Sequence, residues 1–348
     1  MSLIRLCLKA CRCSLMDALR TCCLYALLVL GVNTEEPADM QALREDFLSW
    51  KFGMFIHFNV ATYNNRQWAL GYEDPASFQP QQLDCEQWAQ AAVSAGMRYA
   101  VLTVKHTGGW CLWPSKLTKS HGMAAFVNYQ NGAGDIVAEY VAACRKYNLK
   151  VGLYYCLPRD FGKPDGKESL RGLPPEAKPD PLAFVKGQLT ELLSTYGQID
   201  LLWFDQYQFD LAEQWRDIRS HVRALQPNCI IIANNSIDLH DTDIYGYEYP
   251  WLLGRKHDGW LERNNRTVLP PVDNQTPSEV CDLLGSNWFW TTGGWHLKPA
   301  RQVADMVTLC NTRRSNYLLN VAPDRSGLIP QASLKRLAEI GKLLAVQE

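Results

Sequence analysis

Apolar runs of strand length alternate along this chain with stretches that have the spacing of helices. The runs lack a regular polar alternation, which indicates strands covered on both faces, as in a parallel sheet. Eight runs are expected strands: residues 52–58, 99–104, 150–156, 199–205, 229–233, 243–248, 287–290 and 317–322. Eight strands with helices between them predict an α/β fold, the (β/α)8 TIM-like barrel.

Amphipathic stretches between these runs predict the helices of the barrel. They cover residues 84–96, 135–148, 181–197, 212–225 and 300–314, and a closing helix is expected from Lys335. Typical helix-start residues are Asp84, Asp135 and Pro181, and typical end residues are Gly96, Asn148 and Gly197. A doubly wound sheet is the alternative, but no GxGxxG sequence follows the first expected strand.

Length and charge set further limits on the chain. Its 348 residues, 47% of them hydrophobic, suffice for one large barrel domain over residues 40–348. A net charge of −1 offers no basic field for nucleic acid. The Pro- and Gly-rich segment 158–181 follows the third expected strand, so we expect a long loop at the face of the barrel where sites are built.

Residues 1–33 are typical of a signal peptide or another N-terminal leader. Four basic residues precede an apolar stretch at 22–32, which is too short to span a bilayer comfortably. We expect an exported protein (secreted, periplasmic or lysosome-like) with no membrane contact beyond the leader. An unstructured or membrane-tethered extension is the alternative.

Cysteines are divided between the leader and the expected barrel. Five of the twelve lie in the leader, and the other seven form no CxxC pair. Most of the seven lie inside apolar segments, which favours free buried thiols over a disulfide framework or a zinc site.

Polar side chains gather where the expected strands end, and a barrel builds its sites at that edge. These positions are His57, Lys105, His106, Tyr154, Tyr155, Asp205, Asn234, Asn235, Glu248 and Glu279. A zinc or manganese site of two His and two carboxylates is conceivable, but no local HxH or HxxE pair supports it. We therefore expect no metal and no cofactor. Serine chemistry lacks a GxSxG sequence.

Two carboxylates on neighbouring strand ends suit glycoside hydrolysis better. Asp205 ends the apolar run IDLLWFD, and Glu248 stands between Tyr247 and Tyr249. In this chemistry one carboxylate attacks the anomeric carbon or supports a water molecule, and the other protonates the leaving oxygen. Aromatic neighbours of Glu248 would favour its neutral acid form.

Several segments resemble the α-L-fucosidases of glycoside hydrolase family 29, in the same order and at similar spacings. They are FGMFIHF (52–58), AGMRYAVLTVKHTGGWCLWPSK (95–116), KVGLYYC (150–156), LLWFD (201–205) and YLLNVAPDRSG (317–327). The resemblance runs from about Trp50 to Leu344. Segments 73–92 and 277–290 resemble the branch of the family that prefers α-1,3/1,4-linked fucose.

This resemblance implies roles for individual residues. Asp205 corresponds to the nucleophile and Glu248 to the acid/base, with Glu279 as a second acid/base candidate. The expected substrate-binding residues are His57, Gln67, Trp68, His106, Thr107, Tyr154 and Trp288. Two of these depart from the family pattern, because Thr107 stands where a second His is usual and Gln67 where a Glu is expected.

The resemblance also implies an activity. We expect an exo-acting retaining α-L-fucosidase that takes fucosylated oligosaccharides or glycoconjugates as substrate. The departures at Gln67 and Thr107 leave open a glycosidase for a related sugar, such as an α-L-galactoside or a substituted fucoside. A non-catalytic carbohydrate-binding protein is a further alternative. Because the chain ends soon after the closing helix, we expect no C-terminal β-sandwich domain.

Overall fold

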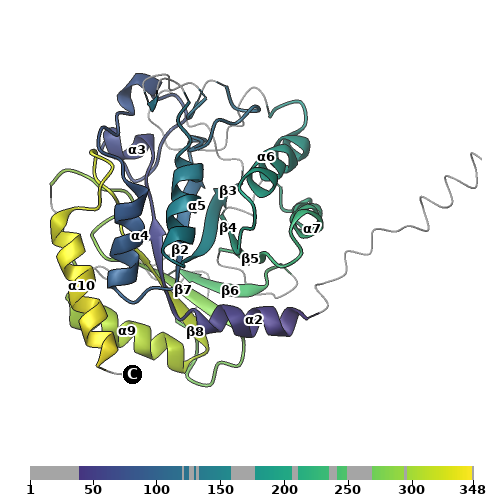
Figure 1. Ribbon diagram of the computed structural model, residues 1–348. Coiled ribbons are helices and arrows are strands. Elements are labelled where there is room, and N and C mark those ends of the chain that lie inside the picture. The colour runs from purple at the N-terminus through teal and green to yellow at the C-terminus, as the bar shows by residue number, and fades with distance from the viewer. Residues whose placement is uncertain are drawn as a thin grey trace, which may run out of the picture. The chain divides into compact units, whose positions relative to one another are not determined.

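Eight parallel strands close into a barrel in chain order, with β8 pairing back onto β1 (Figure 1). The computed structural model describes residues 39–119, 121–124, 129–130, 133–157, 177–205, 211–234, 241–248, 269–293 and 296–346. The expected leader and most of the expected loop at 158–181 lie outside these residues. The predicted (β/α)8 barrel is confirmed.

The strands are short and almost entirely buried. They are β1 (Phe52–Ile56), β2 (Tyr99–Lys105), β3 (Lys150–Cys156), β4 (Leu201–Asp205), β5 (Ile230–Ala233), β6 (Ile244–Glu248), β7 (Ser278–Leu283) and β8 (Ser315–Asn320). Helices surround them: α2 (Met40–Ser49), α3 (Val60–Tyr63), α4 (Cys85–Ser94), α5 (Ile136–Lys146), α6 (Pro181–Thr195), α7 (Trp215–Leu225), α9 (Ala300–Thr312) and α10 (Gln331–Ala345), with a 3-10 turn η1 (Pro75–Ser77). None of the helices within the described ranges is long and apolar enough to cross a membrane.

The predicted helix signals act as expected. The Asp84 side chain accepts hydrogen bonds from the first backbone N–H groups of α4, and Asp135 caps α5 in the same way. Gly96, Asn148 and Gly197 follow helix ends with positive φ angles of 81°, 56° and 71°. A residue with positive φ ends a helix by turning the chain out of it.

The strand expected at 287–290 is wrong, because β7 is Ser278–Leu283. This strand contains two acidic residues, Glu279 and Asp282, and both are 1% exposed. Glu279 points into the barrel, whereas Asp282 pairs with the buried Lys298 on the outside. Buried carboxylates persist when they are hydrogen-bonded or paired, so their presence does not exclude a central strand.

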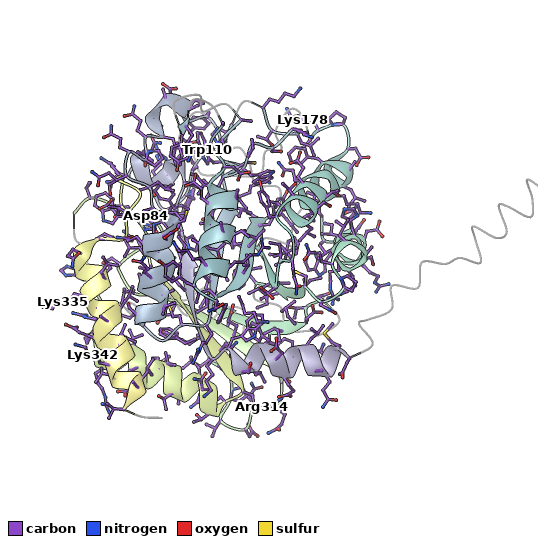
Figure 2. The ribbon with its side chains drawn as sticks, viewed as in Figure 1. Asp84, Trp110, Lys178, Arg314, Lys335 and Lys342 are labelled. Atoms are coloured by element: carbon purple, nitrogen blue, oxygen red, sulfur yellow. The ribbon has the colours of Figure 1, made fainter. Side chains whose placement is uncertain are left out.

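The core has two layers that the strands separate. The outer layer lies between the sheet and the helices; on α10 it takes Leu337 and Ile340, while Lys335 and Lys342 of the same helix project into solvent (Figure 2). The inner layer fills the barrel with aromatic and aliphatic side chains: Phe55, Tyr99, Tyr154, Trp203, Ile232, Ile244 and Leu318 among them.

Gly53 in β1 makes room for the inner layer. A Cβ atom at this position would lie 2.4 Å from the ring of Tyr99, closer than real atoms approach. The absence of a side chain on one strand therefore lets a large ring from the next strand occupy the barrel interior.

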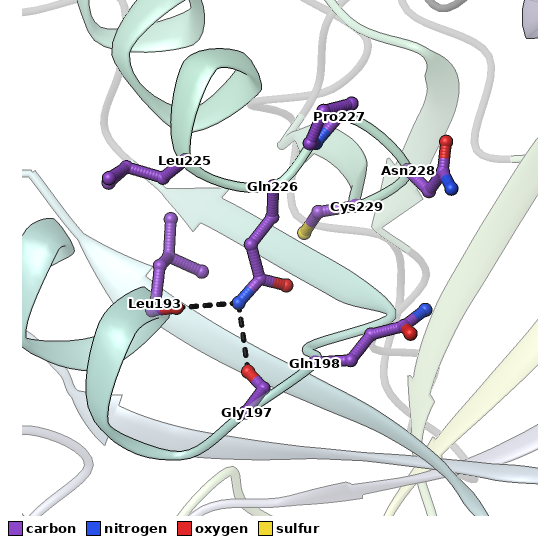
Figure 3. A pocket seen from close by; sticks show the side chains of 8 residues that line it. All are labelled: Leu193, Gly197, Gln198, Leu225, Gln226, Pro227, Asn228 and Cys229. Atoms are coloured by element: carbon purple, nitrogen blue, oxygen red, sulfur yellow. Dashed lines mark hydrogen bonds between the residues drawn. The ribbon is translucent and has the colours of Figure 1, made fainter.

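Gln226, the residue after α7, joins α6 and α7 at the end of the barrel where the strands begin (Figure 3). Its Nε2 donates to the carbonyls of Leu193 and Gly197 at 2.7 and 2.8 Å, and its Oε1 accepts from the backbone N of Ile199 at 2.8 Å. These groups border a cavity of about 280 Å³. All hydrogen-bonding atoms of this amide serve the backbone, so the region has a structural role.

The seven cysteines of the barrel are free and buried, as predicted. Burial raises the pKa of the Cys229 thiol above its ordinary value, as it does for Cys144 and Cys310. Thiols that stay protonated are poor nucleophiles and poor metal ligands.

Candidate active site

Asp205 and Glu248 converge at the C-terminal end of the barrel. They are the last residues of β4 and β6, and β5 lies between those strands. Nδ2 of Asn234, the residue after β5, donates to Oδ1 of Asp205 and to Oε2 of Glu248 at 3.0 Å each. Because both oxygens lie 3.0 Å from the same nitrogen, they are at most about 6 Å apart, and linear hydrogen bonds from the two diverging N–H groups correspond to about 5 Å.

The strand register explains why these side chains meet. The backbone N of Asn234 donates to the carbonyl of Phe204 at 2.8 Å, which continues the β4–β5 ladder by one residue. Asp205, Asn234 and Glu248 thus project inward from three successive strands. Side chains of alternate residues in a strand share one face, and here that face is the barrel interior.

Tyr154 of β3 holds the other oxygen of Asp205. Its hydroxyl donates to Oδ2 at 2.9 Å. Burial, followed by the negative charge of Asp205, raises the pKa of Tyr154, so the hydroxyl keeps the proton that it donates. The Tyr154 ring stacks between Trp203 (centroids 5.4 Å apart) and His106 (5.2 Å). Asp205 is therefore positioned by hydrogen bonds at both oxygens.

His57 and His106 are neutral imidazoles in this site. Burial lowers the pKa of His106 to about 4, although nearby Asp205 opposes the shift. Burial and the proximity of His106 also lower the pKa of His57. Neutral rings suit hydrogen bonds to the hydroxyl groups of a sugar, because each has one donor and one acceptor nitrogen.

Asn320, at the end of β8, selects the tautomer of His57. Its Nδ2 donates to the carbonyl of Trp288 at 2.8 Å, so its Oδ1 is the atom 2.7 Å from Nδ1 of His57. Nδ1 must then carry the proton, which leaves Nε2 as the acceptor.

Ten residues line the cavity at this end of the barrel. They are Phe55, His57, His106, Tyr154, Trp203, Asp205, Asn234, Glu248, Cys281 and Trp288. Six of them are residues predicted for the site from the sequence. Each of the strands β1 to β7 supplies at least one lining residue, either from the strand or from the position just after it.

Three of the predicted substrate-binding residues do not line the cavity. Oε1 of Gln67 accepts a hydrogen bond from the backbone N of Trp288 at 2.9 Å, which fixes the segment that carries this ring. Thr107 is buried with its hydroxyl 3.6 Å from Sγ of Cys156, and Trp68 is half-buried. Gln67 therefore supports the lining residue Trp288, while Thr107 contacts the last residue of β3.

Glu279 occupies the barrel interior below the cavity. It is 1% exposed, and its two oxygens accept from the hydroxyl of Tyr99 at 2.6 Å and from Nε1 of Trp203 at 2.9 Å. Burial raises the pKa of Glu279 to about 7, although both hydrogen bonds oppose the shift. A general acid must reach the leaving oxygen, and of the two acid/base candidates Glu248 is the one that lines the cavity.

Sequence reasoning gave no site role to Asn234, Asn320, Phe55, Trp203 or Cys281. Asn320 is the last residue of β8, so the search for polar side chains at strand ends could have found it. Asn234 was among the strand-end positions, but no motif indicated that it contacts two carboxylates.

An N–H donor between the carboxylates does not suit a metal ion at that position. Among the described residues, no three His, Cys, Asp or Glu side chains are grouped as metal ligands. Two carboxylates about 5 Å apart at the C-terminal end of a (β/α)8 barrel, bordered by neutral His and aromatic rings, are instead typical of retaining glycoside hydrolases.

Comparison with known sequences identifies the family. The Alpha-L-fucosidase family model matches residues 61–348, and the chain belongs to this family. It is 30% identical over 317 residues to Alpha-L-fucosidase 1 of Arabidopsis thaliana, an alignment that covers 85% of this chain and 59% of that protein. The chain therefore spans less than two thirds of the length of this curated relative.

Solved structures show the same fold. Alpha-L-fucosidase isoenzyme 1 from Paenibacillus thiaminolyticus has a TM-score of 0.67 and 28% identity, covering 87% of this chain and 76% of that one. Alpha-L-fucosidase AlfC from Lactobacillus casei, solved in complex with its α-L-fucose product, has a TM-score of 0.68 at 23% identity, covering 88% of this chain and 98% of that one. The barrel is thus the fold of both.

Proposed function

We propose that this protein is an exo-acting retaining α-L-fucosidase that removes terminal α-L-fucosyl residues from oligosaccharides or glycoconjugates. The shared hydrogen bonds of Asn234 support the proposal, because two oxygens that each lie 3.0 Å from one nitrogen are at most about 6 Å apart, and retaining enzymes have carboxyl groups about 5 Å apart. Inverting enzymes need a wider gap of roughly 6.5–9.5 Å, which leaves room for a water molecule. Membership of the alpha-L-fucosidase family supplies the sugar.

The proposed reaction is a double displacement. Asp205 attacks the anomeric carbon while the bond to the leaving oxygen breaks and Glu248 gives that oxygen its proton. The products of this step are a free alcohol and a fucosyl ester of Asp205. Glu248, now a carboxylate, takes a proton from water, whose oxygen attacks the same carbon and releases fucose and the Asp205 carboxylate.

The other residues of the cavity bind the sugar in this proposal. Nε2 of neutral His57 accepts a hydrogen bond from a sugar hydroxyl, and Tyr154 holds Asp205 in place. The faces of Trp203 and Trp288 give apolar contact for the ring carbons and the methyl group of fucose. We further propose a preference for α-1,3/1,4-linked fucose, supported by the sequence of segments 73–92 and 277–290.

A panel of aryl glycosides tests the function. We expect fastest turnover of the aryl α-L-fucoside, and NMR of the first product should show α-L-fucose. Asp205→Asn, which keeps the side-chain size, should lose this turnover. Faster hydrolysis of the α-L-galactoside would reassign the sugar, and β-L-fucose as first product would exclude retention. Binding of fucose by calorimetry without any turnover would indicate a carbohydrate-binding protein.

We also propose that the protein is exported. The basic residues before the apolar stretch at 22–32 support this proposal. N-terminal sequencing of the protein from the medium of expressing cells should give a chain that begins shortly after residue 33. An intact N-terminus on protein that stays inside the cells would contradict it.

A further inference from the structure

We propose that Asn234 is a positioning residue that sets both the spacing of the two carboxylates and the oxygen on which Glu248 carries its proton. This inference rests on the proposed function, since it assigns a role within the double displacement. It follows from one amide group that contacts both carboxylates, 3.0 Å from Oδ1 of Asp205 and 3.0 Å from Oε2 of Glu248.

The barrel itself holds Asn234 in this position. Asn234 is 6% exposed and follows β5, the strand between those of the two acids. Its backbone N is tied to the carbonyl of Phe204 at 2.8 Å. A short side chain on a fixed backbone has few alternative rotamers, so the amide nitrogen is held between the two carboxylates before any substrate arrives.

The amide also selects a proton position. A neutral carboxylic acid has one O–H and one accepting oxygen, and Oε2 of Glu248 already accepts from Asn234. The proton of the acid is therefore directed to Oε1. Because the same bond persists when Glu248 is a carboxylate, Oε1 is also the oxygen that takes the proton from water in the second step.

Charge explains why an amide suits this position better than other side chains. Two carboxylates about 5 Å apart repel each other, and an N–H bond to each stabilises its charged form. A Lys or Arg here would favour two carboxylates and remove the acid, whereas an Asp would add a third negative charge. An amide supplies two donors without a net charge.

Asn234→Ala removes both hydrogen bonds and tests the proposal. With an aryl α-L-fucoside we expect kcat to fall about 100-fold while KM changes less than about threefold. Hydrogen bonds to a charged form lower the pKa of an acid, so their loss should move both limbs of the kcat/KM profile to higher pH. Asn234→Asp should lower kcat further.

Asn316→Ala is the matched control. Asn316 is a buried Asn of β8 whose amide donates to the carbonyl of Phe47 at 2.6 Å, and it touches neither carboxylate. We expect it to lose a similar amount of stability with an unchanged pH profile. If Asn234→Ala shows the same unchanged profile and a comparable kcat, the positioning role is overturned.

A titration independent of turnover separates this inference from the proposed function. Carbon-13 NMR of labelled Asp and Glu carboxyl groups should show that Asn234→Ala raises the lower apparent pKa of the carboxylate pair, compared with the wild-type protein. An unchanged titration overturns the inference even in an active enzyme. A wild-type protein that does not hydrolyse the α-L-fucoside overturns the proposed function instead, and the titration still decides whether Asn234 holds the pair.

Discussion

Two glutamates of this barrel, Glu248 and Glu279, lie at neighbouring levels of its interior. In the pairing of β6 with β7, Glu248 is level with Cys281, whereas Glu279 is level with Gly246, two residues lower. Glu248 lines the cavity and is half-buried, while Glu279 is 1% exposed. A glutamate side chain is thus available for proton transfer at the upper level, that of Glu248, and is enclosed by hydrogen-bond donors at the lower level, that of Glu279.

Trp203 connects the two levels. Its Nε1 donates downward to Glu279, and its ring stacks on Tyr154, which in turn donates to Asp205. The lower acid therefore supports the wall of the upper site. Burial and the number of donors, more than residue type, therefore decide whether a carboxylate has a catalytic or a structural role.

Asp205→Ala should have the largest effect at the upper level. Without the attacking oxygen we expect turnover of an aryl α-L-fucoside to fall by roughly 10⁴-fold or more. Azide, which fits the vacated space, should restore part of the rate and give a β-L-fucosyl azide. Unimpaired hydrolysis in this variant would exclude Asp205 as the nucleophile.

Glu248→Ala should have the second largest effect, and its loss of turnover should depend on the leaving group of the substrate. General acid catalysis contributes about 10²–10⁴-fold, so oligosaccharides with poor leaving groups should be affected most and activated aryl fucosides least. Azide should intercept the fucosyl ester and give an α-L-fucosyl azide, the opposite anomer to that of Asp205→Ala. An equal loss on all substrates would return the acid/base role to Glu279.

Glu279→Gln should change stability more than activity. Its folded-state pKa of about 7 lies above its ordinary value of 4.5, so between these values the folded protein binds a proton that the unfolded chain lacks. The free energy of unfolding contributed by this group therefore falls as pH rises through that window, by an amount on the order of 3 kcal/mol.

Urea unfolding at several pH values measures this contribution. Wild type should exceed Glu279→Gln in stability near pH 5, and the difference should shrink towards pH 8. His57 and His106 are present in both proteins, so their titrations cancel in the difference. A difference that does not vary with pH would show that Glu279 titrates normally, and a 100-fold loss of kcat would place it in the upper site.

Gln67→Ala should have the smallest effect of the four. It removes the acceptor of the Trp288 backbone N–H at 2.9 Å, a loss of about 1 kcal/mol. We expect KM to rise about fivefold with kcat almost unchanged, because the ring moves and the carboxylates do not. Gln79→Ala, which removes an exposed bond to the carbonyl of Ala76, is the control and should leave KM unaltered.

Much of the fold could be predicted from sequence because its signals are local. Apolar runs and capping residues such as Asp84 act within a few positions of the chain, and seven of the eight expected strands overlap observed ones. The strand was expected at 287–290, whereas the observed β7 carries Glu279 and Asp282 inside it and so departs from the apolar pattern of a buried strand. Their partners come from β2, β4, β8 and the segment before α9, which no local pattern reveals.

The sequence predicted which side chains lie near the C-terminal end of the barrel, but not how deep in its interior each of them lies. Strand ends located Asp205, Glu248, His57 and Tyr154, and the structure brings these together. Whether a residue lines the cavity or lies below it depends on the register between strands. Sequence spacing does not contain that register, so Glu279 remained an acid/base candidate and the shared amide was not foreseen.

The placement of three key side chains on successive strands has a consequence for how such a protein can diverge. Neighbouring strands are about 4.8 Å apart, and their backbone hydrogen bonds fix this spacing. The sheet therefore sets the backbone positions of Asp205, Asn234 and Glu248. We expect that exchanging a segment that begins beyond Glu248 for a relative's would leave the positions of these three side chains, and with them the proposed double displacement, intact.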